Sequence, residues 1–475
     1  MKTNLTLYAL LIALAGCAVG PNYQKPAVKT VAHWSEPLVG GETNRSASLA
    51  DWWKTFNDPE LNSLVERAVK SNLDLHIAEA RVREARAQYG VAAADLWPTV
   101  DSASSFKRIG MSKNLPTPKG FPRALSLYQA GFDASWELDV FGGTRRNTEA
   151  ARAEVSGAEF GQRAALVTLL GEVANNYVEV RGLQRRLDIT RENIKAQEDA
   201  LAITQSRFTN GLTGDLDVKQ STTILATTRA EIPALETALQ TAIHRLDVLL
   251  GQQPGALLAE LSTSASFPVA APEVPVGLPS ELLLRRPDVQ QAERELAAAT
   301  ARIGVATADL FPKFSLTGVA GLQSVSASDW FSSGSKFWAL GPTVQWKIFD
   351  AGRICANIRV QNARQEQALA HYEQTVLQSF EDVENALVSY AKEQVRRREL
   401  ATAVKSSQES LHRANELYAN GLSNFINVLD AERSVYQAQD QFVQSDRNVS
   451  ANLITLYKSL GGGWKTEGVE VASAR

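Results

Sequence analysis

The chain has 475 residues, which exceeds the usual size of a single compact core, so it forms either several domains or one extended architecture. Hydrophobic residues make up 44% of the sequence, and 49 Lys and Arg nearly balance 52 Asp and Glu. A chain with so little net charge lacks the strongly basic surface that binding to nucleic acid requires.

The N-terminus has the pattern of a bacterial lipoprotein signal. An apolar run over residues 5–14 follows Lys2 and is too short to span a bilayer. Leu14-Ala15-Gly16-Cys17 resembles the lipobox, in which cleavage leaves the cysteine as the N-terminus and its thiol receives lipid. We therefore predict a signal peptide over residues 1–16 and a lipid anchor at Cys17. The alternative is an ordinary signal peptide with a chance cysteine.

The rest of the chain offers neither a disulfide nor a membrane helix. After lipidation of Cys17, the second cysteine, Cys355, has no partner in the chain, and a buried thiol is the favoured interpretation. No later apolar stretch reaches about 20 residues, so we expect that no helix crosses the bilayer and that any spanning is done by strands.

The chain matches itself at a spacing of about 210 residues, which indicates an internal duplication. The matching segments are 92–98 with 306–312, 141–145 with 349–353, and 207–212 with 417–422. Five prolines between the halves favour an extended linker. We therefore divide the mature chain into a lipid-anchored extended segment, a first repeat, a linker, a second repeat and a tail, which cover residues 17–60, 61–250, 251–279, 280–461 and 462–475.

Each repeat contains a long helix with apolar residues seven positions apart, followed by a returning helix. In the first repeat the long stripe is Leu166, Val173, Val180, Leu187, Ile194, Leu201 and Phe208, and the second repeat has Val376, Val383, Tyr390, Arg397, Val404, Leu411 and Tyr418. The returning stripes are Leu225, Ile232, Leu239 and Leu246, and Val435, Phe442, Val449 and Leu456. Two antiparallel helical hairpins follow, and a continuous helix over residues 145–210 would be roughly 100 Å long. Further helices are expected at about 60–96 and 280–310.

Before each long helix, apolar and polar residues alternate, which predicts β-hairpins at about 99–140 and 313–349. The apolar positions include Tyr128, Phe132, Trp136, Trp338, Leu340, Val344, Trp346 and Ile348. A soluble sheet that packs one face on helices is one interpretation. A membrane barrel is the other, but it needs at least eight strands and tolerates no open edge in lipid. Because one chain supplies about four strands, several chains would have to share the barrel.

Together these features resemble the outer membrane factor family, and specifically its lipoprotein branch, whose members are channel subunits of tripartite efflux systems with a pump of the resistance-nodulation-division type. The residues that carry the resemblance are 17–23, Asp51-Trp52-Trp53, 58–61, 308–312, 422–432 and 456–464. The resemblance implies a mixed α and β fold: an internally duplicated chain, a homotrimer, an α-helical barrel of long coiled-coil helices, and a shared twelve-stranded transmembrane β-barrel with four strands from each chain.

The same resemblance implies a passive conduit that exports small molecules, such as drugs or other toxic compounds, from the periplasm to the outside. It would lie in the outer membrane of a Gram-negative bacterium and extend into the periplasm. Its partners would be two further copies of the chain, a periplasmic adaptor, an inner-membrane transporter and outer-membrane lipid, and not nucleic acid. The alternatives are the outer-membrane channel of a type I protein secretion system and, in a different class, a periplasmic adaptor lipoprotein.

The resemblance also implies where such a channel closes. By position, Ile426 and Asp430 match the apolar residue and the carboxylate that ring the closed entrance in similar channels. The alternative is that Asp430 is a solvated residue in the first turn of its helix, favoured there by the helix dipole. The helix turns would contact the adaptor and close the entrance; their residues are Gly211, Asp215, Asp217, Gly421 and Asn424.

The two turns are not equivalent, because the first repeat has Lys219 and Gln220 where the second has Leu429 and Asp430. The roles of Asp215 and Asp217 are therefore open between channel entrance and helix start. The five histidines include no pair at metal-ligand spacing, and we expect no enzyme activity, no metal and no cofactor.

Overall fold

The computed structural model describes residues 18–28, 33–35, 42–43, 49–116, 118, 120, 122–264, 274–277 and 279–464. The predicted lipid anchor Cys17 and the tail after Trp464 lie outside this range. The chain divides into two compact units. The first comprises Met1–Ala27, Arg81–Glu159 and Gln291–Glu373, and the second comprises Val28–Ala80, Phe160–Gln290 and Gln374–Arg475. Each unit therefore combines segments of both repeats.

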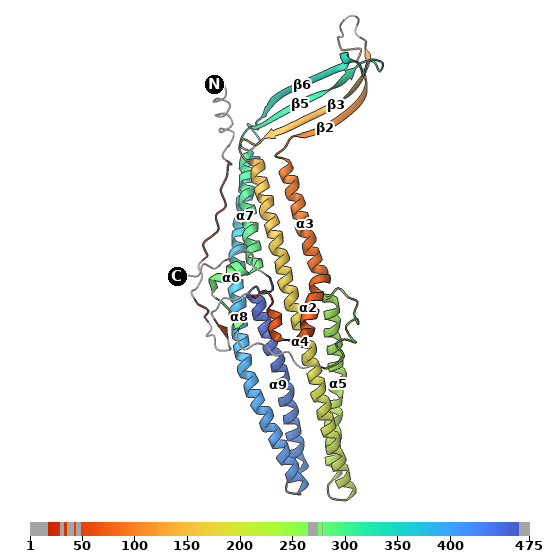
Figure 1. The fold of residues 1–475 in the computed structure, drawn as a ribbon, viewed down its shortest axis with the longest axis vertical. Helices are drawn as coiled ribbons and strands as arrows, with labels where there is room; N and C mark the ends of the chain where they lie inside the picture. The colour runs from red at the N-terminus through yellow and green to blue at the C-terminus, as the bar shows by residue number, and fades with distance from the viewer. Residues whose placement is uncertain are drawn as a thin grey trace. The chain divides into compact units, whose positions relative to one another are not determined.

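The first unit contains a four-stranded antiparallel sheet with the order β2-β3-β5-β6 (Figure 1). Its strands are β2 (Thr99–Gly110), β3 (Ala124–Leu138), β5 (Lys313–Ser324) and β6 (Lys336–Gln345). The central pairing of β3 with β5 joins the first repeat to the second. The alternation predicts a strand that includes Trp346 and Ile348, but β6 ends at Gln345, so both residues lie beyond the observed strand. The indole N–H of Trp346 donates to the carbonyl oxygen of Leu310 at 3.0 Å.

The strand register gives this sheet one apolar and one polar face. The apolar face carries Val100, Phe106, Phe132, Trp136, Leu316, Trp338, Leu340 and Val344, all of them exposed in the single chain. The opposite face carries Asp101, Ser105, Gln129, Asp133, Thr317 and Thr343. Since Trp338 is 78% exposed, no helix in the described part of the chain covers it, whereas a soluble sheet packs its apolar face on helices.

The long helices of the two repeats have equal lengths. They are α4 (Gly143–Thr209) and α8 (Arg353–Ala419), with 67 residues each, and the returning helices are α5 (Asp215–Leu249) and α9 (Phe425–Ser459), with 35 each. The shorter helices are α2 (Pro59–Ser71), α3 (Leu73–Ala94), α6 (Pro279–Arg285) and α7 (Pro287–Ala308). Among the described residues, no helix combines the length and the apolar character that crossing a membrane requires.

Minor elements complete the described chain. Strands β1 (Glu42–Thr43) and β4 (Val274–Pro275) form a short parallel pair, and η1 (Trp52–Phe56) and η2 (Ser333–Ser335) are 3₁₀ turns. Asp58 starts α2 by accepting the backbone N–H groups of Glu60 and Leu61 at 2.9 and 3.1 Å. Pro59 at the first helical position fits this start, because it lacks the N–H that would otherwise need a partner.

The main hydrophobic core of the described residues lies in the second unit. There Trp52 of η1 stacks on Tyr457 of α9 with ring centroids 5.2 Å apart, and Leu61, Leu64 and Leu246 are fully buried. Burying a side chain of this size stabilises the fold by about 1.5–3 kcal/mol. This core therefore fastens α2, α5 and α9 to the middle of α4.

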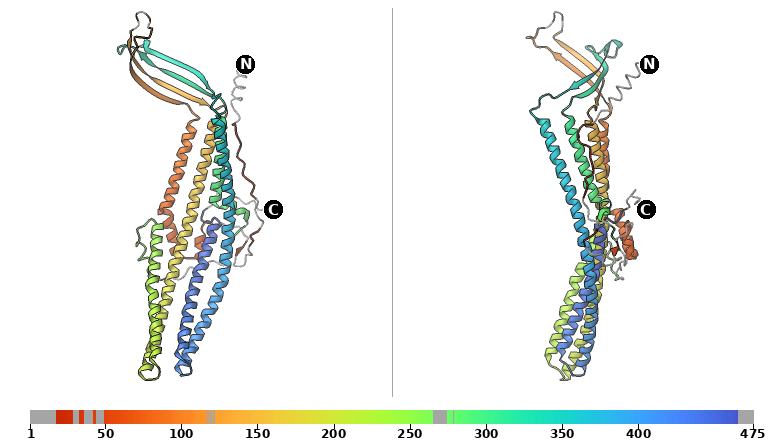
Figure 2. Two further views of the ribbon diagram at one scale, coloured as in Figure 1. Left: turned by 180° about the vertical axis from the view of Figure 1, so that it is seen from behind. Right: turned by 90° about the vertical axis from the view of Figure 1, so that its left-hand side faces the viewer.

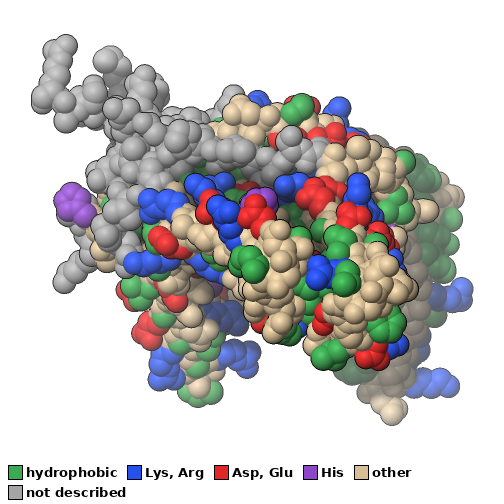
Figure 3. Space-filling model, turned by 90° about the horizontal axis from the view of Figure 1, so that it is seen from below, with side chains coloured by type: hydrophobic (Ala, Val, Ile, Leu, Met, Phe, Trp, Pro, Cys, Tyr) green, Lys and Arg blue, Asp and Glu red, His purple; other side chains and the backbone are tan. Residues whose placement is uncertain are grey.

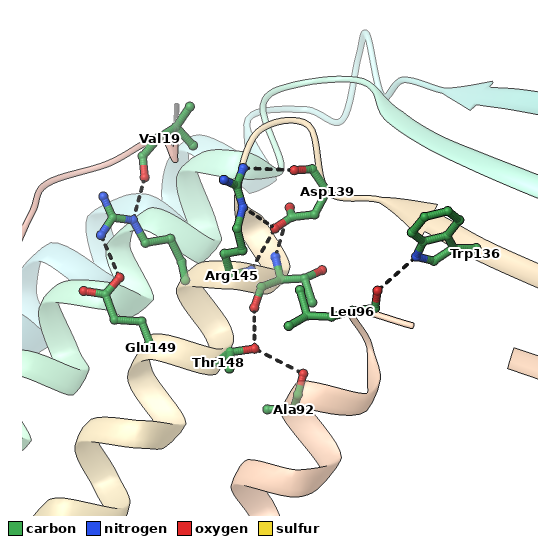
Figure 4. A network of polar contacts seen from close by, with 10 residues as sticks. Val19, Ala92, Leu96, Trp136, Asp139, Arg145, Thr148 and Glu149 are labelled. Atoms are coloured by element: carbon green, nitrogen blue, oxygen red, sulfur yellow. Dashed lines mark hydrogen bonds and ion pairs between the residues drawn. The ribbon is translucent and has the colours of Figure 1, made fainter. Parts of the chain in front are cut away.

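The sheet joins α4 through a polar network in the first unit (Figure 4). The carboxylate of Asp139 accepts the backbone N–H groups of Thr144 and Arg145 at 3.2 and 2.8 Å and the Nε–H of Arg145 at 3.2 Å. The second repeat uses the same device, since Asp350 accepts the N–H groups of Gly352 and Ile354 at 2.9 Å each. In both repeats an aspartate therefore caps the N-terminus of the long helix.

The prediction of a buried Cys355 is wrong, because its side chain is exposed in the structure. Cys355 lies in the first turn of α8, and no side chain between residues 353 and 370 is buried in the single chain. Burial in α8 begins at Tyr372, and the buried residues that α8 contributes to the main core begin at Val383. The residue type alone does not predict that the start of α8 is exposed while later parts of the same helix are buried.

Candidate functional site

The two helical hairpins α4–α5 and α8–α9 turn at the same end of the second unit (Figure 2). We call these two turns, residues 210–214 and 420–424, the tip. Gly211 and Gly421 adopt left-handed φ values of 71° and 73°, which a glycine tolerates without the steric cost of a Cβ. The residue after each glycine donates its N–H to a carbonyl oxygen five positions back, at 2.9 Å in both turns. Both hairpins therefore end their first helix with the same Schellman motif.

A small apolar cluster holds the second turn together. We call it the tip cluster; it consists of Tyr418, Phe425, Val428 and Leu429. Tyr418 and Phe425 pack with ring centroids 5.1 Å apart, and Ile224 of α5 and Leu411 of α8 pack against the cluster. Because Ile224 belongs to the first hairpin, the tip cluster connects the two hairpins of one chain.

A cation–π contact adds a second connection between the hairpins. The guanidinium of Arg207, near the end of α4, lies 4.5 Å from the ring centroid of Tyr418 and donates to the carbonyl oxygen of Tyr418 at 3.2 Å. Burial raises the pKa of the Tyr418 phenol, so this ring stays neutral. The sequence analysis did not identify Arg207 as a functional residue. The one sequence feature that could have indicated a role is that Arg207 is charged, whereas the matching residue of the second repeat is Leu417.

Ile426 and Asp430 lie one helical turn apart on the same exposed side of α9. Ile426 is 45% exposed, and within the described residues no donor contacts the Asp430 carboxylate. The interpretation of Asp430 as a first-turn residue is wrong. Helix α9 begins at Phe425, so Asp430 lies beyond the first turn, where stabilisation by the helix dipole has largely faded.

The remaining predicted tip residues occupy the starts of the returning helices. Asp215 and Asp217 lie in the first turn of α5, where a carboxylate favours the helix N-terminus. Asp217 accepts a hydrogen bond from the hydroxyl of Thr213, whereas Asp215 is exposed. Asn424 is the N-cap residue of α9 but makes no side-chain capping bond. Viewed from below, acidic and basic side chains are interspersed over the molecule (Figure 3).

The sequence comparisons decide the family. The profile of the family described as outer membrane efflux protein matches residues 64–252 and 278–462, which is more than half of the chain. The chain belongs to the outer membrane efflux protein family. It is 32% identical to the toluene efflux pump outer membrane protein TtgI of Pseudomonas putida over 97% of this chain and 98% of that protein. It is 33% identical to the probable outer membrane lipoprotein SilC of Salmonella typhimurium, over 98% and 99% of the two chains.

The solved structures agree with this assignment. The outer-membrane channel OprN has a TM-score of 0.88 and 36% identity to this chain, covering 94% of it and 100% of OprN. This member of the outer membrane efflux protein family is therefore an efflux channel protein of the outer membrane of a Gram-negative bacterium. The alternative of a periplasmic adaptor lipoprotein is wrong.

Proposed function

We propose that three copies of this chain form a passive conduit of a tripartite efflux pump, with a shared twelve-stranded β-barrel in the outer membrane and an α-helical barrel in the periplasm. The observation that supports this most strongly is the four-stranded sheet, whose apolar face is exposed and whose outer strands β2 and β6 lack a second neighbour among the described strands. Lipid tolerates no such open edges. Since β2 and β6 run in opposite directions, β6 of one copy can pair antiparallel with β2 of the next.

The polar face of the sheet would then line the barrel. Asp101, Asp133 and Thr317 lie on that face, opposite the aromatic face that would contact lipid. Twelve strands leave an aqueous channel in the middle rather than a packed core. The cargo would be small molecules, such as drugs or other toxic compounds, in line with relatives named as toluene and cation efflux proteins. A periplasmic adaptor and an inner-membrane transporter would supply opening and energy.

The tip would be the periplasmic entrance of the conduit. Three copies of Asp430 around the axis would bring three carboxylates together, and like charges in one ring repel one another and favour a bound cation. Ile426, one turn away, would add an apolar ring. Adaptor contacts would fall on residues in and next to the two turns, namely the exposed Gly211, Asp215, Gly421 and Asn424 and the half-buried Asp217.

The first experiment tests whether the purified, full-length protein forms trimeric pores. We expect cross-linking in detergent to stop at a trimer and planar bilayers to show discrete single-channel steps, because only closure with other copies satisfies both sheet edges. The protein without its lipid anchor should still need detergent. A monomer that stays in solution without detergent and forms no pores would contradict the conduit.

A second prediction concerns the lipid anchor that we propose at Cys17. Replacing Cys17 with serine should remove the acyl mass from the mature protein, because a hydroxyl does not replace the thiol as the lipid acceptor. Mass spectrometry of the purified protein measures the added acyl mass directly. Cys355→Ser is the matched control, and it should retain that acyl mass. An unchanged acyl mass in Cys17→Ser would show that lipid is attached elsewhere or not at all.

A further inference from the structure

Glu432 of α9 is a buried carboxyl close to the tip. Its side chain is 8% exposed, and within the described residues it forms no hydrogen bond or ion pair. Glu432 lies one helical turn beyond Val428 of the tip cluster and one turn before the buried Val435, so it continues the buried face of α9. Asp430 is only two residues away but is exposed, since two helical positions differ by about 200° around the axis.

The elements that pack at this level offer Glu432 no charged partner. Ile224 of α5 and Leu411 and Ala414 of α8 pack on the tip cluster, and one turn beyond Ile224 lies Thr228, whose hydroxyl donates to the Ile224 carbonyl oxygen at 3.1 Å. The charged residues on the neighbouring turns are exposed; they are Glu198, Asp199, Arg229, Glu231, Lys405, Glu409, His412, Arg413, Asp430 and Arg433. The half-buried Arg207 is engaged with Tyr418, and the nearby phenols are Tyr418 and Tyr436.

An ionised carboxylate in such a position is costly, because it leaves water without gaining a cation or hydrogen-bond donors in return. Burial alone raises the pKa of the Glu432 carboxyl from 4.5 to about 7. The packed arrangement therefore binds a proton at Glu432 more tightly than an arrangement in which water reaches the side chain.

We propose that Glu432 is a proton-sensitive latch of the tip. Its neutral form is compatible with the packing of α8 and α9 against α5, whereas its ionised form favours a state in which the α8–α9 hairpin has separated from α5 and water reaches the carboxylate. This inference rests on the proposed conduit, whose entrance would open by that separation. It concerns a different residue, with a different environment, from the exposed Asp430.

The direction of the pH dependence follows from the two protonation states. As the pH rises from 4.5 to about 7, the separated state gains over the packed state, by up to about tenfold per pH unit for each chain. Above about pH 7 both states carry an ionised Glu432, and the ratio no longer changes. Acidification should therefore close the tip.

The test compares single-channel recordings of the full-length protein between about pH 5 and about pH 8, which covers most of the expected rise and the plateau above about pH 7. The open fraction of the wild type should rise with pH and level off near neutrality. Glu432→Gln, which keeps the shape but never ionises, should stay mostly closed and lose the dependence. Glu409→Gln, the same change at an exposed position of α8, should behave as the wild type. A pH dependence that persists in Glu432→Gln but disappears in Asp430→Asn would overturn the proposal.

A second readout separates failure of the latch from failure of the conduit. Hydrogen–deuterium exchange over α9 can be measured without a pore. Because the intrinsic exchange rate of amides changes with pH, the wild type is compared with Glu432→Gln at the same pH each time. We expect the wild type to exchange faster than Glu432→Gln near neutral pH and equally at low pH. This result without any pores would support the latch and refute the conduit. Equal exchange at every pH, with pores present, would refute the latch alone.

Discussion

Single-channel conductance should rise several-fold when Asp430 is replaced by alanine. In the proposed trimer three exposed Asp430 carboxylates converge at the entrance, where no donor among the described residues of the chain neutralises them. Alanine removes both the charge and the side chain that narrows the opening, while Ile426 stays one turn away. Planar-bilayer recording of the purified protein measures the change. Asp430→Asn separates the two effects, since it removes the charge and keeps the size.

The matched control for this variant is Asp215→Ala, at the start of the other returning helix, α5. Asp215 is also an exposed carboxylate, but it lies in the first turn of its helix, so its loss should cost about 0.3–1 kcal/mol of helix stability without changing conductance. If Asp430→Ala has the conductance of the wild type, another position of α9 narrows the entrance. An equal rise in both variants would indicate a general loosening of the tip.

Replacing Arg286 with methionine should lower the stability of the fold by about 2–3 kcal/mol, because the guanidinium, whose side chain is 12% exposed, loses its hydrogen bonds to two carboxylates and a carbonyl oxygen. The guanidinium of Arg286 donates to Asp288 at 2.6 and 3.0 Å and to Asp382 at 2.8 Å. It also donates to the carbonyl oxygen of Ser459 at 3.3 Å, so one side chain ties the start of α7 to α8 and to the end of α9. Thermal unfolding in detergent measures the loss as a lower midpoint.

Arg229→Met provides the comparison for Arg286→Met. Arg229 pairs with Glu198 at 2.5 Å, but both side chains are about half exposed, so solvent and salt screen the pair and its loss should cost at most about 1 kcal/mol. Similar midpoints for the two variants would show that burial of Arg286 contributes little. Both variants remove one arginine and keep a long unbranched side chain. Arg286 lies between α6 and α7 and Arg229 lies inside α5, where arginine and methionine have similar helix propensities.

Much of the fold follows from periodicity in the sequence. The heptad stripes predict two helical hairpins because helices that pack along one another place apolar residues seven positions apart, and α4 and α8 are continuous over 67 residues each. The strands follow from the two-residue alternation, but the end of β6 does not. Trp346 keeps the alternation, yet it lies beyond the last paired residue, where its indole bonds to the carbonyl oxygen of Leu310.

The contacts at the tip could not be predicted in the same way. A stripe indicates which face of a helix packs on other helices, but it does not identify the residues that the face contacts. The contact of Arg207 with Tyr418 and the burial of Glu432 both depend on how two hairpins pack, which the spacing within one hairpin does not determine. The residue at which α9 starts could not be predicted from the sequence either, because Asn424, Asn427 and Asp430 are all residue types that favour a helix start.

The exposure of Cys355 makes the protein easy to label. If the thiol of Cys17 is acylated as proposed, Cys355 carries the single free thiol of the sequence, and its position on the surface of α8 lets a maleimide probe react once per chain. Three identical spin labels around one axis would then report the radius of the assembly through their mutual distances. The unsubstituted protein would thus report the width of the assembly at the start of α8.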